Sequence, residues 1–414
     1  MRRISSGMND TDVQSRLRIQ EFKLNKANNQ LGSQRRIQEL RDDPIAAGHL
    51  VRYQSFEGRI KQFEANAQTL TERFTVREGY INDSLQIMHR IRELAVQGAH
   101  GTYTAEDLHN MAGEVDQLLR EIIQNANAVD QDGNALFAGT NTKATAFEVE
   151  MGNVEGSGVP MIAQVVYNGN VGTNNVEVDE GQYLEVNNSG NRTFWAEAQM
   201  LTSGRDATQW QAQEDGIISV DGKEISVSRG DNVYALISKI NNSDAAVKAS
   251  LDPLTQGIHL QTTDARQLWL SDVRGTVLTD LGVISGAEQR PPYNAATSAR
   301  VSGGSLFDSV IALRDAMLRG DHEAIGGRVL GSLDAGMSNL VTRLSENGSN
   351  YERAMLNVTR NSQTALNVTK MISSEGDLDF TKAVTDMKML DYVHQASLSV
   401  AGKMYSSTLL NYMR

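Results

Sequence analysis

The chain has 414 residues, a formal net charge of −12 at pH 7 and no cysteine. The acidic balance argues against a nucleic-acid partner, and the lack of cysteine excludes disulfides, thiolate metal sites and thiol nucleophiles. No apolar run approaches the roughly 18 residues of a membrane span, and the N-terminus lacks the apolar segment of a cleavable secretion signal. We therefore expect neither nucleic acid nor membrane as a partner, and an export route without a cleaved signal stays open.

The first predicted element is a polar helix over roughly the first 40 residues. Its apolar positions are sparse, because Leu17, Leu24 and Leu31 fall seven residues apart among Asn, Gln and charged residues. This spacing is a thin heptad seam. An isolated helix gains little stability without tertiary packing. We therefore expect this segment to be disordered in the monomer and to fold when a partner helix becomes available.

The stretch RDDPIAAGHL (41–50) predicts a break that is followed at once by a new helix. Asp43 is a suitable N-cap, because its carboxylate can accept the free backbone N–H groups of the next turn. Pro44 fits the first helical position, where its missing N–H costs nothing. The proline also disfavours the helical conformation at Asp43. One helix should end before Asp43 and another should begin after it.

The strongest periodicity follows this break. Apolar residues recur at alternating spacings of four and three over about five heptads, as in a coiled-coil seam. The seam comprises Phe56, Ile60, Phe63, Ala67, Leu70, Phe74, Ile81, Leu85, Met88, Ile91 and Ala95. An ordinary intramolecular bundle explains such a stripe as well as contacts between copies do. We interpret it as the permanent core of a rod, followed by a second helix from about Leu108 to Ala126.

The region from about 141 to 302 changes to a period of two. Apolar and polar residues alternate between Gly, Asn and Asp turns in PMIAQVVYNGN, NNVEVDEGQYLEVNNSG and GIISVDGKEISVSRGD, which predicts half-buried strands. DNVYALISKINN predicts a short amphipathic helix, and VKASLDPLTQGIHLQTTD predicts a hairpin. All three tryptophans lie here, as expected where a compact core is built.

Helical periodicity returns after this region. One helix is predicted from about Ser305 to Ser373, and SSEGDLDF interrupts it, with Gly376 as the breaker and Asp377 or Asp379 as the next cap. A last helix then runs to the C-terminus. Its apolar stripe comprises Phe380, Val384, Met387, Leu390, Leu398, Ala401, Tyr405 and Leu409.

The predicted fold is mainly α-helical with a β-rich insertion. Helices from both chain ends form a long antiparallel rod or coiled coil, and the centre is a variable α+β or β region. We expect three parts: terminal helices at 1–42 with 378–414, a rod core at 43–140 with 303–377, and a β-rich insertion at 141–302. The two breaks should act as hinges between the first two parts. The hinge residues would be Asp42, Asp43, Pro44, Gly376 and Asp377.

Motifs for chemistry are scarce. DQDGNA (130–135) imitates the start of a calcium loop but lacks the required glycine and the twelfth-position glutamate. HEAIG at His322 lacks the second histidine of a zinc motif. We expect no catalytic residue, no metal site and no cofactor.

Three stretches resemble bacterial flagellins and their hook-associated relatives. LGSQRRIQELRDDPIAAG (31–48) resembles the N-terminal signature of that family, and IMHRIRELAVQGAHGTYTAEDL (87–108) is similar to its long core helix. EGDLDFTKAVTDMKMLDYVHQASLSVAG (375–402) resembles its C-terminal signature. Pro44 and DGNALFAGTNTKATAF (132–147) are more typical of the members that join hook and filament. Residues 216–284 resemble the small insertion module found across the family.

The resemblance implies a structural component of the bacterial flagellum that connects hook and filament. Such a protein would be exported unfolded and assembled as a helical or ring layer, outside the cell or in the periplasm if the flagellum is enclosed there. Its implied partners are flagellin, a second junction protein, copies of itself and an export chaperone on the C-terminal helix. A filament flagellin is the first alternative. A surface adhesin or binding module that uses the β-rich middle is the second.

Overall fold

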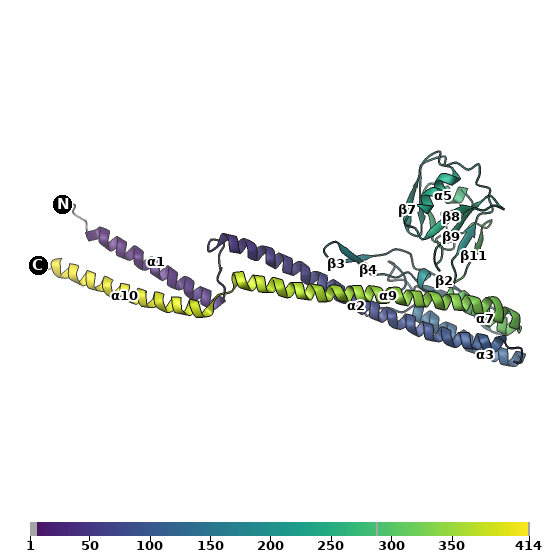
Figure 1. The fold of residues 1–414 in the computed structure, drawn as a ribbon, viewed down its shortest axis with the longest axis horizontal. Helices are drawn as coiled ribbons and strands as arrows, with labels where there is room; N and C mark the ends of the chain where they lie inside the picture. Colours follow the sequence, from purple (N-terminus) through teal and green to yellow (C-terminus); the bar gives the residue numbers. More distant parts are fainter. Residues whose placement is uncertain (1–5, 287–288, 413–414) are drawn as a thin grey trace. The chain divides into compact units, whose positions relative to one another are not determined.

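A computed structural model describes residues 6–286 and 289–412 of the chain (Figure 1). Its internal contacts divide the chain into two compact units. The first unit, which we call the terminal unit, comprises Met1–Ala65 and Val358–Arg414. The second, which we call the central unit, comprises Asn66–Asn357. Two long helices, α2 (Pro44–Ala99) and α9 (Leu330–Gly376), contribute residues to both.

The predicted fold class is confirmed: long helices at both ends of the sequence enclose a β-rich middle. The remaining helices are α1 (Ser6–Ser33), α3 (Ala105–Ala126), α4 (Gly190–Thr193), α5 (Val233–Asn241), α6 (Val277–Asp280), α7 (Leu306–Arg319), α8 (His322–Ala324) and α10 (Phe380–Tyr412). The strands are β1 (Phe147–Asn153), β2 (Pro160–Tyr167), β3 (Asn175–Asp179), β4 (Gln182–Glu185), β5 (Met200–Thr202), β6 (Gly216–Val220), β7 (Lys223–Val227), β8 (Val247–Leu251), β9 (Ile258–Thr262), β10 (Leu270–Arg274) and β11 (Arg300–Ser302).

In the terminal unit, α1 and α10 lie side by side and antiparallel (Figure 1). The first turns of α2 meet the last turns of α9 in the same unit. Leu50 of α2 packs against the buried Gly376, where an added Cβ would lie only 3.1 Å from a leucine methyl group. Further along, the Thr369 hydroxyl donates to the Glu57 carboxylate at 3.1 Å.

In the central unit, the apolar core joins α2, α3, α7, α9 and the first strands. Helix α3 begins with a capping box, in which the Thr104 hydroxyl accepts from the Asp107 N–H and the Asp107 carboxylate accepts from the Thr104 N–H. Ser305 and Asp308 form the same box at the start of α7. Helices α3 and α7 then pack against each other.

The predicted seam of α2 is buried for most of its length. Ile60, Leu70, Phe74 and Ile91 are at most 4% exposed, together with Ala67, Ile81, Met88 and Ala95. Phe56 and Phe63 are only half-buried. The period therefore identified the inward face of α2 correctly, although the burial along this face is uneven.

The prediction of a single helix from about Ser305 to Ser373 is wrong, because two helices, α7 and α9, occupy this stretch. Helix α7 ends at Gly320, which adopts a left-handed conformation with φ 67° and ψ 28°, the usual backbone of a helix C-cap glycine. Asp321 then caps the short α8 by accepting from the Ala324 N–H. A π-helical segment with non-helical angles at Gly327 precedes α9. The chain thus reverses between α7 and α9, which lets α7 pack on α3.

The predicted strands pair as local antiparallel hairpins. Strand β1 pairs with β2, β3 with β4, β6 with β7, and β8 with β9. Larger sheets have the orders β10-β6-β7 and β11-β5-β9-β8. The predicted amphipathic helix is α5, capped by Asn232, whose side chain accepts from the Ala235 N–H. Together these sheets and α5 enclose a second apolar core.

Candidate assembly surface

The α1–α10 pair brings together most of the side chains that the heptad seams predicted. Leu17, Leu24 and Leu31 are half-buried on α1, and Val384 and Met387 are half-buried on α10. A groove of about 470 Å³ runs between the helices. It is lined on α1 by Val13, Arg16, Leu17 and Gln20 and on α10 by Tyr392, Val393, Ala396, Ser397, Val400 and Ala401. The seams therefore face each other within a single chain.

Part of the predicted α10 stripe does not face α1. The side chains of Phe380 and Leu398 are 59% and 49% exposed. The inward face is formed instead by Val384, Met387, Leu390, His394, Ser397 and Ala401. The physical reason is the 3.6-residue repeat, because Leu398 lies about 100° around the helix from the half-buried Ser397. The side chain of Leu409 lies outside the described residues.

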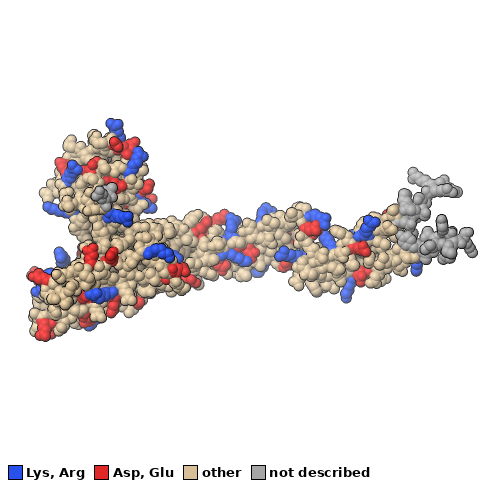
Figure 2. Space-filling model, turned by 180° about the vertical axis from the view of Figure 1, so that it is seen from behind, with Lys and Arg blue, Asp and Glu red and all other residues tan. Residues whose placement is uncertain are grey.

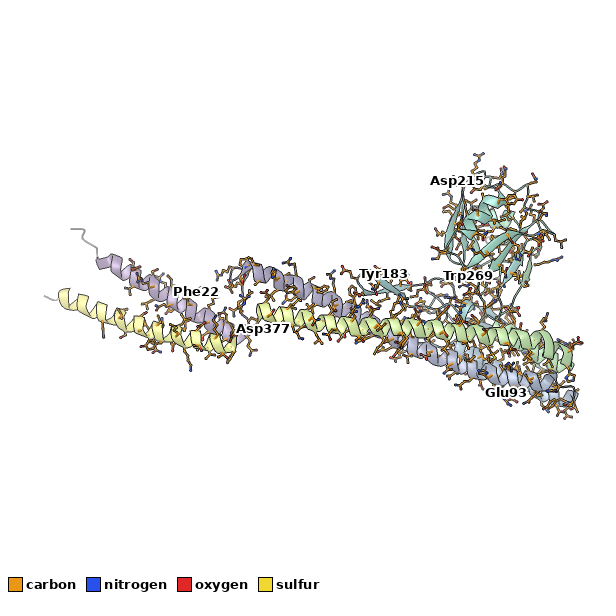
Figure 3. All side chains as sticks on the ribbon, viewed as in Figure 1. Phe22, Glu93, Tyr183, Asp215, Trp269 and Asp377 are labelled. Atoms are coloured by element: carbon orange, nitrogen blue, oxygen red, sulfur yellow. The ribbon has the colours of Figure 1, made fainter. Side chains whose placement is uncertain are left out.

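Large apolar side chains on both helices are exposed to solvent. On α1 they include Ile19 and Phe22, which are 52% and 57% exposed (Figure 3). On α10 they include Met389 at 68% and Tyr392 at 74%. Apolar surface of this kind, repeated along both helices, is typical of a protein contact site.

The predicted hinge residues lie in one hydrogen-bonded connection of the terminal unit. Helix α2 begins at Pro44, and Asp43 caps it by accepting from the Ala46 N–H at 3.0 Å, as expected. Helix α9 ends at Gly376, and Asp377 follows it (Figure 3). The N-cap of α10 is Asp379, whose carboxylate accepts from the Lys382 N–H at 3.0 Å. The caps thus stand where the sequence placed them, and their hinge motion stays a prediction.

Two main-chain hydrogen bonds tie this connection together. The Arg36 N–H donates to the Gly376 carbonyl at 2.8 Å, and the Leu378 N–H donates to the Gln34 carbonyl at 3.1 Å. Asp377 also forms an isolated antiparallel bridge with Arg35. Residues 34–36 and 376–378 therefore form a miniature two-stranded ladder between the helices.

The sequence did not identify Lys26 and Arg36 as site residues. The Lys26 ammonium lies 2.6 Å from the Asp42 carboxylate and, as its hydrogen-bond donor, holds the pKa of Asp42 below its usual value. The pKa of Asp43 is also lowered, first by the Ala46 N–H and then by the Arg36 guanidinium at 3.2 Å. Glu375 accepts from Arg36 as well. The available signal for the Lys26–Asp42 and Arg36–Asp43 ion pairs was the run of basic residues before Asp42.

The central unit buries two arginines that the heptad pattern also missed. Arg314 of α7 is fully buried and donates to the Asp116 carboxylate at 2.8 Å and to Asp315 at 2.9 and 2.7 Å. Arg77 of α2 donates to the Val186 carbonyl at 2.7 Å, and burial lowers its pKa to about 10. These contacts fix how the helices and the β-rich region meet within that unit.

Charged side chains also link α9 to the chain around β9. Arg343 of α9 is 2% exposed and donates to Asp264 at 2.8 Å and to Glu346 at 3.0 and 2.8 Å. Arg192 donates to the same Glu346 at 3.0 Å, and Arg266 pairs with Asp264 at 2.5 Å. Arg266 also pairs with Asp221, so the network holds three arginines and three acids.

The structure also describes the side chains that were weighed as metal ligands and the DQDGNA stretch. Across residues 6–286 and 289–412, no three His, Asp or Glu side chains are placed to hold a metal ion. The DQDGNA stretch is a turn in which the Asp130 carboxylate accepts from the N–H groups of Asp132 and Asn134. No described helix combines the length and the hydropathy that crossing a membrane requires. On the face shown in Figure 2, acidic and basic side chains are interspersed.

Two family models match this chain, one in its N-terminal third and one in its β-rich middle. Residues 4–142 match the bacterial flagellin N-terminal helical region, and residues 215–263 match the flagellin hook IN motif. The second match overlaps residues 216–284, where the sequence predicted an insertion module.

The similar proteins include both flagellins and hook-associated proteins. A flagellin from Salmonella muenchen is 27% identical over 269 residues, which cover 64% of this chain and 52% of the relative. Flagellar hook-associated protein 3 from Escherichia coli is 23% identical over 169 residues, which cover 41% and 49%. The chain thus spans about half the length of these relatives.

One solved structure that resembles the chain is the hook-associated protein 3 of Legionella pneumophila, with a TM-score of 0.48 and 14% identity over 78% of this chain and 97% of that one. The N-terminal family match contains two of the three signatures read from the sequence, residues 31–48 and 87–108. This chain is thus similar to the bacterial flagellins, with a match to their N-terminal helical region at residues 4–142 and to the flagellin hook IN motif at residues 215–263.

Proposed function

We propose that this protein is a structural component of the bacterial flagellum that joins the hook to the filament, as its likeness to hook-associated protein 3 suggests. It would act as a non-enzymatic adaptor, assembled as a helical or ring layer at the end of the hook. The flagellum would lie outside the cell, or in the periplasm of a cell that encloses it. Export would proceed on the unfolded chain.

The observation that carries this proposal is the apolar surface of the α1–α10 pair. A heptad seam already joins the two helices, yet Ile19, Phe22, Met389 and Tyr392 stay exposed. Burying such side chains against neighbouring subunits contributes about 25 cal/mol per Å² of apolar area. One contact repeated head to tail that does not close gives a helical assembly. The terminal unit is therefore the proposed assembly element.

The proposed partners are those that the resemblance to flagellar proteins implies. Copies of the chain would pack beside one another through the terminal unit, with flagellin on one side of the layer and a second junction protein on the other. Before export, a chaperone would cover the apolar residues of α10. The exposure of Met389, Tyr392 and Val400 supports this last proposal, because an unassembled helix with such a surface aggregates without a cover.

Deletion of the gene tests the proposal directly. A cell without a junction protein should build hooks that carry no filament and should release flagellin into the medium. Electron microscopy of the cells and gel analysis of the medium measure both effects. Missing or shortened filaments with no released flagellin would instead identify the chain as a filament flagellin, which the similarity to the Salmonella protein keeps as the second candidate.

An adhesin or binding module that uses the β-rich middle is the remaining alternative. Deletion of residues 150–300 would separate it from the junction function. If cells with this deletion swam normally but lost attachment to a surface, the adhesin would be the better explanation. If they lost their filaments, the region would serve the junction itself.

A further inference from the structure

The dipeptide Asn-Gly occurs twice in the chain, at residues 168–169 and 347–348. Asparagine loses ammonia most readily before glycine, because glycine has no side chain that hinders the reaction. The first Asn-Gly lies in the bend after β2, and the second lies within α9. The proposed function uses neither of them. Their different surroundings decide which one can react.

The reaction joins the main-chain nitrogen of the glycine to the side-chain carbonyl carbon of the asparagine. The nitrogen loses its proton as the new C–N bond forms. The bond from the carbonyl carbon to Nδ2 then breaks, so that ammonia leaves and a five-membered succinimide remains. Water opens this ring at either carbonyl and gives aspartate or isoaspartate. No enzyme or oxidant is needed, but the glycine N–H must be free of a hydrogen bond and the backbone must be able to bend locally.

Residues 168–169 meet these conditions. Asn168 is exposed to solvent, outside any helix or strand. The N–H groups on both sides of Gly169 are bonded, that of Asn168 to the Ala146 carbonyl at 2.9 Å and that of Asn170 to the Ala138 carbonyl at 3.1 Å. The Gly169 N–H itself donates to no acceptor within the described ranges. The attacking nitrogen is therefore unpaired.

The fold requires glycine at this position. A Cβ atom added to Gly169 would lie 2.3 Å from the hydroxyl oxygen of Tyr167. That hydroxyl is held in place, because it donates to the Phe137 carbonyl at 3.1 Å and the Asn170 carbonyl at 2.9 Å. A larger residue, which would slow the reaction, therefore does not fit here.

The second Asn-Gly is protected. Asn347 is 3% exposed, and its amide donates to the Phe74 carbonyl at 2.8 Å. Gly348 lies inside α9, so its N–H donates within the helix to the carbonyl four residues earlier. Reaction there would need local unfolding of α9, which costs free energy. We propose that Asn168 is a site of spontaneous deamidation in the folded protein and that Asn347 is not.

Deamidation at Asn168 would place a new charge in an acidic part of the chain. Residues 144–191 contain no Lys or Arg, and their acids are Glu148, Glu150, Glu155, Glu177, Asp179, Glu180 and Glu185. The Glu148 carboxylate accepts from the Asn168 amide at 2.7 Å. The reaction removes this hydrogen bond and sets two carboxylates side by side, where like charges repel. The modification should therefore loosen the base of the β1–β2 hairpin.

Peptide mass mapping of the full-length protein tests the proposal. The folded protein is kept at mildly alkaline pH and physiological temperature and is sampled over days. The peptide that contains Asn168 should gain the mass difference between –NH₂ and –OH and should separate into aspartate and isoaspartate forms. A local opening of only about 1.4 kcal/mol already slows a reaction about tenfold, so Asn347 should react more slowly by at least this factor.

Two outcomes of the mapping would overturn the proposal. One is equal rates at Asn168 and Asn347. The other is an unchanged Asn168 in the protein over a time in which a synthetic peptide of residues 165–173 reacts completely. The synthetic peptide shows the rate of the same dipeptide without the fold.

Variants then assign the site and its effect. Asn168→Gln should abolish the mass change, because the larger ring that glutamine would form closes far more slowly, and Asn347→Gln is the matched control. Asn168→Asp imitates one product and should speed hydrogen exchange of the Asn170 amide, corrected for its intrinsic rate. Adding Glu148→Gln should reverse this effect. A mass change that persists in Asn168→Gln would overturn the assignment, and unchanged exchange in Asn168→Asp would overturn the loosening.

Discussion

The guanidinium group of Arg36 donates two hydrogen bonds to the main-chain carbonyl of Glu375, at 3.1 Å from Nε and 2.7 Å from Nη2, across 339 residues of sequence. This carbonyl lies in the last turn of α9, where no later N–H of the helix is available. A cation at a helix C-terminus also suits the helix dipole. Arg36 therefore caps α9 from the far end of the sequence.

Replacing Arg36 with glutamine should loosen the connection between the terminal helices. The loss should be at most about 1 kcal/mol, because the arginine side chain is 43% exposed and solvent screens its charge. Hydrogen exchange of the amides of residues 36 and 378 should become faster while those of α3 stay unchanged. Arg35→Gln is the control, since that neighbouring side chain is exposed. Equal exchange in both variants would contradict the capping role.

The same connection should weaken in acid. The pKa values of Asp42 and Asp43 are lowered, by Lys26 and by the Ala46 N–H respectively. A carboxyl group whose folded pKa is depressed stabilises the fold above its unfolded pKa, near 3.9 for aspartate. That stabilisation is lost as the pH falls below this value towards the folded pKa. The protection factor of the Ala46 amide, which is its intrinsic exchange rate divided by its observed rate at each pH, should fall below about pH 4 when it is followed from about pH 6 to pH 3.

The control for this pH dependence is Asp43→Asn. Asparagine also caps helices but does not titrate. The variant should therefore keep the cap while losing part of the acid response. If it showed the full wild-type acid response at the Ala46 amide, Asp43 would not be its source.

A polar layer limits the stability of the α1–α10 pair. The Oε1 atom of Gln20 and the Nδ1 atom of His394 are buried on the inward faces of the two helices, and neither has a hydrogen-bond partner. Replacing both residues with leucine should stabilise the terminal unit by about 1–3 kcal/mol, because it removes two unpaired polar groups and adds apolar contact. Thermal unfolding followed by circular dichroism measures the gain. Gln14→Leu, at an exposed position of α1, should have no such effect, and a less stable double variant would contradict this account.

The central unit should depend strongly on Arg314. Arg314→Met leaves the buried carboxylate of Asp116 with Arg120 as its remaining partner among the described residues. Breaking one side of a buried ion pair costs about 3–5 kcal/mol, and we expect the lower value because Arg120 remains. Urea unfolding measures the loss, and Arg319→Met on the exposed face of α7 is the control. Adding Asp116→Leu should recover most of the stability, and a double variant as unstable as the single one would show that the charge pair is not the cause.

Local patterns were enough to predict most of the fold. Asp43 and Pro44 start α2 because capping and the proline ring act within one turn of the chain. The hairpin β8–β9 and the helix α5 likewise follow from periodicity and turn residues. Gly320 is the exception, because its left-handed C-cap ends α7, whereas the apolar period runs on past it. A glycine followed by a capping Asp321 was the available signal.

Long-range pairings could not be predicted from the sequence alone. The partners of Arg36 and Arg314 lie 339 and 198 residues away, and no local spacing encodes such a contact. The exposure of Phe380 and Leu398 was missed for a related reason. A stripe of apolar residues shows that a helix has a buried face, but the face that meets a given partner depends on the partner's side chains.

The stretch between β5 and β11 is joined to the rest of the central unit by these two strands, which lie next to each other. Strand β5 pairs antiparallel with β11, so that Thr202 lies opposite Arg300 and Met200 opposite Ser302. The two backbones are thus about 4.8 Å apart, although almost a hundred residues of sequence separate them. The stretch between them can therefore be lengthened or exchanged for another domain with neighbouring ends, provided that the replacement keeps a partner for the buried Arg343 of α9, which pairs with Asp264. The paired strands β5 and β11 are therefore a position at which evolution or protein engineering can replace one inserted domain with another.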